Sequence, residues 1–231
     1  ALHTEGLGKI VALGAGALRA IVNASGGKVG GQRTGLYLAL PNFSLREDTY
    51  VDFGPPTVPG GRRSLAPGND EVPRSRTFAQ QCEDHLVERL GRAARVDLAA
   101  EVVEIRFGDN CTFLRALDAA ITGLGSGAVD RCIVGGIDSY LDVPSLEWGM
   151  LRRRLKSETN PVGFAPGEAA VFLELAARPP AGTEVLGIVS KPGFGDEPGQ
   201  VPAPEVQAPR GIGLSLAIRT AIRNAQRPVG L

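Results

Sequence analysis

The stretch Glu101–Leu124, EVVEIRFGDNCTFLRALDAAITGL, contains a strand, a tight turn and a helix in succession. Its first part predicts a strand, because apolar and charged side chains alternate from 101 to 107. Its last part, 111–124, predicts a helix with one apolar face, formed by Phe113, Leu114, Leu117, Ile121 and Leu124. Strand–turn–helix units of this kind are typical of α/β sheets with helices packed on their faces.

The turn of this unit, Gly108-Asp109-Asn110-Cys111-Thr112, holds its reactive side chains. Ligands of α/β sheets bind beyond the carboxyl ends of the strands. We expect Asp109 or Asn110 to cap the helix and Cys111 to lie in its first turn, where the N–H groups and the helix dipole favour a thiolate. Cys111 is therefore a candidate nucleophile, although a negative charge on Asp109 would oppose the thiolate and the turn offers no general base.

The alternative for Cys111 is a structural role, because free cysteine is one of the most frequently buried residue types. Cys82 is predicted to lie on the apolar face of a helix and Cys132 in the middle of a strand. Both are therefore expected in the core.

Helices and strands alternate on both sides of the unit, which predicts an α/β fold for most of the chain. Further helices are expected at 6–24, 77–92, 145–155 and 211–225, and further strands at 34–40, 131–137, 169–175 and 184–190. Between them lie two segments rich in proline and glycine, 42–76 and 191–210, which predict long loops.

The composition excludes several classes of protein. The 231 residues include 25 basic and 25 acidic side chains, which gives no reason to expect a nucleic-acid partner or an acidic membrane surface. No run of 18 apolar residues predicts a membrane span, and residues 1–9 show no secretory signal. Three cysteines are too few for a disulfide framework and lack metal-ligand spacing, so a reduced, cytoplasmic protein without a metal is expected.

Three linked motifs between Gly127 and Leu175 resemble the β-ketoacyl synthase branch of the thiolase-like superfamily. They are DRCIVGGIDS at 130–139, the basic RRLK at 153–156, and GFAPGEAA at 163–170, which runs into a strand. Ketoacyl synthases show the same order of nucleophile helix, Gly-Gly strand and G-F-x-x-G-E-G-A loop. The resemblance covers roughly residues 1–230 and is strongest over 95–177.

The residues of these motifs suggest structural roles. Gly135 and Gly136 would let the end of a strand turn closely against other backbone. Gly163 and Gly167 would flank a loop that returns to the sheet, where the Glu168 carboxylate could accept backbone N–H groups or simply support the loop.

The resemblance implies a layered α/β/α thiolase-like fold, with an N-terminal half at 1–177 and the start of a C-terminal half at 178–231. It implies acyl transfer or condensation from a thioester on acyl carrier protein or coenzyme A, in fatty acid or polyketide synthesis. It further implies a homodimer and no cofactor. Cys111 would be the nucleophile, with Asp109, Asn110, Thr112 and Phe164 lining the substrate site.

The chain departs from the family at two points. Counted back from Gly135, the family's nucleophile falls nearer Asn110 than Cys111, and the family's T-A-C-S turn is replaced by GDNCT. The H-G-T and N-F-G-F-G-G segments, which hold the two histidines of the Cys-His-His centre, are missing, and the sequence has only His3 and His85. Two alternatives therefore stay open: an inactive thiolase-fold scaffold or binding partner, and an interaction module that binds through 42–76.

Overall fold

The computed structural model describes residues 7–25, 33–41, 74–98, 100–108, 111–179, 181–197 and 210–226. Their centre is a sheet of four strands, β1 (Thr34–Pro41), β2 (Val102–Gly108), β3 (Arg131–Ser139) and β4 (Glu168–Ala176), in the order β2-β1-β3-β4. β1 is parallel to both β2 and β3, whereas β4 is antiparallel to β3. The carboxyl ends of β1, β2 and β3 consequently lie along one edge of the sheet.

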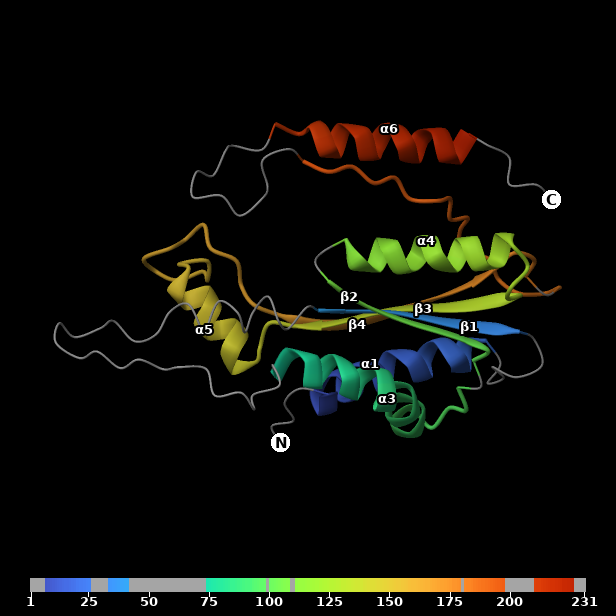
Figure 1. Cartoon of the computed structure of the whole chain (residues 1–231), viewed down its shortest axis with the longest axis horizontal. Helices are drawn as coiled ribbons and strands as arrows, with labels where there is room; N and C mark the ends of the chain where they lie inside the picture. Colours follow the sequence, from blue (N-terminus) through green and yellow to red (C-terminus); the bar gives the residue numbers. More distant parts are fainter. Residues whose placement is uncertain are drawn as a thin grey trace.

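Helices cover both faces of this sheet (Figure 1). α1 (Leu7–Ala24) and α3 (Arg74–Ala94) lie on one face, and α4 (Thr112–Gly125) lies on the other. α5 (Val143–Leu151) follows β3, and α6 (Ile212–Gln226) lies on the far side of α4 from the sheet. The predicted α/β class is confirmed, and so are the helices and strands expected between residues 6 and 177, with shifts of one to three residues at most of their ends. The helix expected at 145–155 ends early, at Leu151. The predicted loop at 42–76 lies almost wholly outside the described residues.

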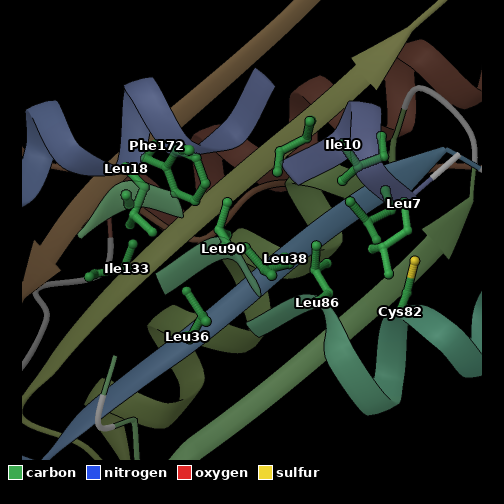
Figure 2. Packing of buried hydrophobic residues seen from close by; sticks show 14 of the residues in the cluster. Leu7, Ile10, Leu18, Leu36, Leu38, Cys82, Leu86, Leu90, Ile133 and Phe172 are labelled. Atoms are coloured by element: carbon green, nitrogen blue, oxygen red, sulfur yellow. The ribbon is translucent and has the colours of Figure 1, made fainter. Parts of the chain in front are cut away.

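The core has two parts, one on each face of the sheet, and β1 contributes to both. Every residue of β1 is buried, since its two faces are covered by different helices. Leu36 and Leu38 pack with Leu86 and Leu90 of α3 (Figure 2), whereas Tyr37 and Ala39 face α4. Full burial stabilises each large apolar side chain by about 1.5–3 kcal/mol, so this strand holds the two helical layers together.

α1 is long and apolar enough to cross a membrane by length and composition, and no other helix of the described residues meets this test. Its apolar face is already used, because Leu7, Ile10, Leu18 and Val22 are buried in the core on the α3 side of the sheet. Arg19 also donates hydrogen bonds to the carbonyl groups of Ala93 and Ala94 at the end of α3. In this structure α1 is therefore a core helix.

Two glycines of α1 provide a matched pair of stability tests. A Cβ on Gly16 would meet no atom within 4 Å, whereas a Cβ on Gly14 would lie 2.6 Å from Ile137 Cδ1 and 2.9 Å from Leu90 Cδ1. Gly16→Ala is expected to raise the free energy of unfolding by about 0.5–1 kcal/mol, the gain in helix propensity. Gly14→Ala should not show this increase in stability, because its methyl group would clash with Ile137 and Leu90 in the core. Urea unfolding of both variants measures the difference, and equal changes in stability would contradict this packing of α1.

The strand predicted at 184–190 is wrong. This segment contains no strand, and none of the described strands pairs with it. Leu186 and Ile188 are 93% and 92% exposed. A strand needs a neighbour to satisfy its backbone N–H and C=O groups, so apolar, β-branched residues alone did not create one here.

The continuation of that segment packs between α4 and α6 (Figure 1). It approaches α6 very closely, since a Cβ on Gly193 would lie 2.0 Å from the carbonyl oxygen of Ala217. The Glu197 carboxylate accepts backbone N–H groups at the start of α6, which lowers its pKa. Lys191 lies 3.9 Å from Asp118 of α4. The described chain thus forms successive layers: α1 and α3, the sheet, α4, the 191–197 segment and α6. Division of the chain at residue 177 stays a prediction.

Candidate functional site

The turn between β2 and α4 presents a thiol at the carboxyl edge of the sheet. Cys111 is the N-cap of α4, and its carbonyl group accepts the N–H of Arg115 at 3.1 Å. The expectation that Asp109 or Asn110 caps the helix is therefore wrong, as is the placing of Cys111 inside the first turn. The Cys111 side chain makes no capping hydrogen bond, and the Cys111 backbone is helical, with φ −91° and ψ −6°, rather than extended as in most N-caps. The Cys111 side chain is exposed.

Two glycines position this turn. A Cβ on Gly108, the last residue of β2, would lie 2.2 Å from Oγ1 of Thr112, so the buried Thr112 side chain occupies that space. A Cβ on Gly136 of β3 would lie 3.0 Å from the ring of Phe113. The first turn of α4 thus packs on the end of β2 and the middle of β3, and these contacts position the backbone of Cys111. The first N–H groups of any α-helix have no partner inside the helix and can stabilise a negatively charged atom.

The other two cysteines are buried in the core, as predicted. Cys82 and Cys132 are both 0% exposed, and burial raises the pKa of each thiol to about 12. All three cysteines carry thiols rather than disulfides. Since thiolates rather than thiols react, the two buried side chains are protected by both burial and protonation.

Alkylation of the native protein therefore distinguishes the three thiols. Brief treatment with iodoacetamide at pH 7.5 is expected to modify Cys111 at least about 100-fold faster than Cys82 or Cys132, because burial shields those two thiols from the reagent and raises their pKa to about 12, whereas Cys111 is exposed. Peptide mapping by mass spectrometry measures each site, and labelling in urea is the control in which all three react. Faster native labelling of Cys82 than of Cys111 would contradict the structure.

The Gly-Gly pair of β3 has a different role from the one expected. Gly135 and Gly136 lie inside a regular strand that continues to Ser139, so the chain does not turn there. Instead, each glycine leaves room for an aromatic ring. A Cβ on Gly135 would lie 2.3 Å from Cε1 of Phe172, on one face of the sheet, and Gly136 accommodates Phe113 on the other.

Glu168 joins β3, β4 and α1. It is opposite Ser139 in the antiparallel ladder and accepts a hydrogen bond from Ser139 Oγ at 3.1 Å. Lys9 Nζ of α1 lies 3.1 Å from the same carboxylate oxygen. The Lys9 contact, followed by the Ser139 bond, lowers the pKa of Glu168. The donors to Glu168 are side chains rather than the backbone N–H groups that we expected, because ladder pairing brings Ser139 across from Glu168.

The sign of the Glu168 shift predicts a dependence on pH. A carboxyl with a lowered pKa stabilises the fold above its ordinary pKa of 4.5, and this contribution disappears as the pH falls through the lower folded value. Lys9→Met is expected to lower the melting temperature at pH 7 and to have a smaller effect below pH 4. Arg89→Met on the exposed side of α3 serves as the control. An effect of Lys9→Met that grows in acid would contradict the assignment.

The GFAPGEAA loop is held close to the residues that follow α5. A Cβ on Gly163 would lie 2.4 Å from the carbonyl oxygen of Leu155, so the backbone of the loop approaches the backbone of Leu155 closely. Gly167 has open space instead, and its carbonyl group accepts the N–H of Tyr140 at 2.9 Å. Phe164 contacts the Tyr140 ring edge-to-face at 5.6 Å and is 36% exposed.

The contacts therefore gather the predicted residues into two groups joined by β3. In the first group, beside Cys111, Thr112 packs against Gly108 and Phe113 packs against Gly136. In the second group, at the end of β3, Phe164 contacts Tyr140 and Glu168 contacts Ser139. Asp109 and Asn110 lie outside the described residues, as does His3. The described chain contains no group of three His, Cys, Asp or Glu side chains that could hold a metal ion.

His85 is remote from the thiol. It is exposed on α3, whose apolar face packs on the side of the sheet opposite α4. Within the described residues, the histidines of a Cys-His-His centre are consequently not assembled around Cys111.

Sequence reasoning missed two contacts at this edge. Lys9 is distant in sequence from Glu168, and no spacing rule connects them. The Arg115 guanidinium lies 5.2 Å from the centre of the Phe194 ring, which ties α4 to the segment before α6. Arg115 and Phe194 can both be found in the sequence, but nothing in their spacing indicates that the two side chains are in contact.

Comparison with known proteins gave matches among solved structures, whereas no family model and no curated protein matched. The ketosynthase from module 6 of the bacillaene synthase of Bacillus subtilis 168 is 17% identical, with a TM-score of 0.34, covering 64% of this chain and 22% of that chain. OleA of Xanthomonas campestris, with bound lauric acid and lauroyl-CoA, is 13% identical, with a TM-score of 0.43, covering 97% and 58%.

A third structure, the oxazolomycin ketosynthase domain OzmH KS7 of Streptomyces albus JA3453, is 16% identical, with a TM-score of 0.30, covering 67% of this chain and 23% of that chain. The chain spans less than two thirds of the length of each of these structures. Two of the three are named as ketosynthases. The layered α/β architecture itself rests on the sheet order and helices described above.

Proposed function

We propose that this chain is a ketosynthase-like acyl acceptor in which Cys111 takes an acyl group from a thioester. The observation that supports it most is the exposed thiol at the N-cap of α4, directly beyond the carboxyl end of a parallel strand. This is the place where α/β sheets bind ligands. The three linked motifs add the resemblance to ketoacyl synthases.

The proposed step is an exchange of thioesters. The Cys111 sulfur attacks the carbonyl carbon of the donor, a new C–S bond forms, and the bond to the donor sulfur breaks. The Cys111 proton leaves through water and the released donor thiol takes up a proton, so the step balances without a cofactor. N–H groups in the first turn of α4 would stabilise the developing charge on the carbonyl oxygen.

Decarboxylative condensation would need more than this site supplies. It requires groups that transfer protons and stabilise an enolate, and His85 lies on the other side of the sheet. We therefore propose acyl acceptance as the activity of these residues, and condensation only where further polypeptide provides those groups. The donor would be an acyl carrier protein or coenzyme A thioester, in fatty acid or polyketide synthesis.

Incubation with an acyl-coenzyme A followed by acid quenching and intact mass measurement tests the proposal. One added acyl group per chain is the expected result, and it should disappear on treatment with neutral hydroxylamine, which cleaves thioesters. A chain whose mass stays unchanged, while Cys111 still reacts with iodoacetamide, would overturn the proposal.

A catalytically inactive scaffold of the same fold is the second candidate. The position of His85 favours it, together with the turn sequence, which departs from that of the family. In that case Cys111→Ala would leave partner binding unchanged and no acyl group would be transferred. The same acylation experiment thus separates the two candidates.

We further propose that the protein is a cytoplasmic homodimer. Its three thiols suit a reducing compartment. β4 is an edge strand of the sheet, and its Val171 and Leu173 are 51% and 37% exposed, so a second copy could cover them. Sedimentation at several protein concentrations measures the association, and a monomer at 100 μM would contradict it.

A further inference from the structure

We propose that Arg115 makes Cys111 selective for acyl groups that end in a carboxylate, such as succinyl and glutaryl groups carried on a thioester. The proposal rests on the acyl acceptance proposed above and adds the chemical class of the acyl group. The residues that support it lie on the face of α4 that bears the thiol and on the segment between α4 and α6 (Figure 1).

Cys111, Leu114 and Arg115 lie on one face at the start of α4. The N–H of Arg115 bonds to the carbonyl group of Cys111 at 3.1 Å, so these two residues are one helical turn apart. Helical residues three and four positions apart are neighbours on the helix surface, and all three side chains are exposed. Long side chains of a helix lie over the turn that precedes their own Cα. We therefore expect the Arg115 guanidinium over the turn that begins at Cys111.

The ring of Phe194 holds the Arg115 guanidinium in place. The central carbon of the guanidinium lies over this ring, 5.2 Å from the ring centre. A stacked guanidinium uses its flat face, so the N–H donors at its edge stay available. They match the two oxygens of a carboxylate in parallel hydrogen bonds. Because the stacking has already ordered the side chain, less conformational entropy is lost when a carboxylate binds.

The acidic side chains of the same two elements do not neutralise Arg115. Asp118, three residues after Arg115, lies 3.9 Å from Lys191. The Glu197 carboxylate accepts backbone N–H groups at the start of α6. Asp196 is exposed, where water and salt screen its charge. Arg115 therefore keeps its charge available to an incoming carboxylate on the face that bears the thiol.

The spacing between the thiol and the cation suits a short acyl chain. Residues four apart in a helix are separated by about 6 Å along its axis. Succinyl and glutaryl groups place a short run of methylene groups between the thioester carbonyl and the carboxylate, and Leu114 and Phe194 offer apolar surface to those groups. The exchange of thioesters is unchanged: the acyl carbon moves from the donor sulfur to Cys111, and the second carboxylate stays ionised.

Glutaryl-coenzyme A and valeryl-coenzyme A are matched probes, because their acyl groups have equal numbers of carbons and differ in the terminal carboxylate. We expect the glutaryl donor to acylate Cys111 about threefold to fivefold faster, the range that an exposed ion pair provides, with a smaller preference at high salt. Arg115→Gln should remove the preference, whereas Arg115→Lys should retain part of it. Arg89→Gln on α3, across the sheet from α4, is the control and should keep the full preference.

The ratio of the two rates separates recognition of the carboxylate from a structural role of Arg115. A structural role would lower both rates together in Arg115→Gln and leave their ratio unchanged. That result would overturn the proposal, and so would equal rates with both donors in the wild-type protein. If Cys111 takes an acyl group from neither donor, acyl acceptance itself is wrong and the preference falls with it. The two failures are therefore distinguishable.

Alkylation measures the same preference without an acyl donor. Iodoacetate carries a carboxylate and iodoacetamide a neutral amide, so the ratio of their rates at Cys111 reports the charge beside the thiol. Arg115→Gln should lower this ratio about threefold, as loss of an exposed ion pair does, and Arg89→Gln should leave it unchanged. Peptide mapping by mass spectrometry measures the modification of Cys111. An unchanged ratio in Arg115→Gln would overturn the proposal.

Discussion

Gly135→Val is expected to be strongly destabilising, lowering the free energy of unfolding by about 1–3 kcal/mol, as overpacking of a close-packed core does. A Cβ at this position would lie 2.3 Å from Cε1 and 2.5 Å from Cδ1 of Phe172. The Phe172 ring is itself 6% exposed and packs with the buried residues on the α1 and α3 side. The ring therefore cannot move aside without opening the core.

A second variant shows whether the ring is the cause. Phe172→Leu removes part of the ring, so the double variant with Gly135→Val should lose less stability than the sum of the two single variants. Contacting residues typically couple in this way by about 0.5–3 kcal/mol. Gly167→Ala is the matched control from the neighbouring motif, since a Cβ there meets nothing within 4 Å.

The stabilities of the variants are compared through their urea unfolding midpoints, with the slope of the unfolding free energy against urea concentration held the same. If Gly135→Val were as mild as Gly167→Ala, or if its cost simply added to that of Phe172→Leu, the role given to the Gly-Gly strand would be contradicted.

The sequence was sufficient for the elements between Leu7 and Ala176 because their periodicity is strong. The alternation in β2 and the apolar face of α4 arise from local spacing, which is visible along the chain. Tertiary context determined the rest. Residues 184–190 have the composition of a strand, but a strand also needs a partner, and none of the described strands provides one.

The sequence was enough to locate the candidate site, but not to predict the contacts within it. The turn before α4 was identified from its strand and helix, whereas the N-cap shifted to Cys111 because the first turn of α4 is seated on Gly108 and Gly136. Glu168 was identified as an acceptor, but Lys9 could not be, since only folding brings α1 against β4. Likewise, the Gly-Gly pair is evident in the sequence, but its role is not, because it depends on the rings of Phe172 and Phe113, which come from other elements.

Cys111→Ala is expected to abolish acyl transfer from a thioester, a loss of at least about 100-fold in the rate of acylation, because no other exposed thiol is available. The two remaining cysteines are fully buried and have pKa values near 12. The exposure of Cys111 means that its truncation leaves no cavity, so the melting temperature should change little. Cys82→Ser is the complementary control: it should lower the stability of the fold, because the side chain is buried, but it should leave acylation unchanged.

Moving the thiol by one residue tests which turn position is reactive. The swap Asn110→Cys with Cys111→Asn places the thiol at the position that counting back from Gly135 favours. We expect slower acylation in the swap than in the wild type, because a shift of one residue at a helix start changes the direction of a side chain by about 100°. Faster acylation of the swapped protein would instead assign the reactive position to residue 110.

A peptide map of the acylated wild-type protein shows directly whether Cys111 accepts acyl groups. After incubation with an acyl-coenzyme A, the protein is digested at acidic pH and each cysteine-containing peptide is weighed by mass spectrometry. One acyl group is expected, on the peptide that contains Cys111, and the peptides of Cys82 and Cys132 should be unmodified. An acyl group on either buried cysteine, or none on Cys111, would contradict it.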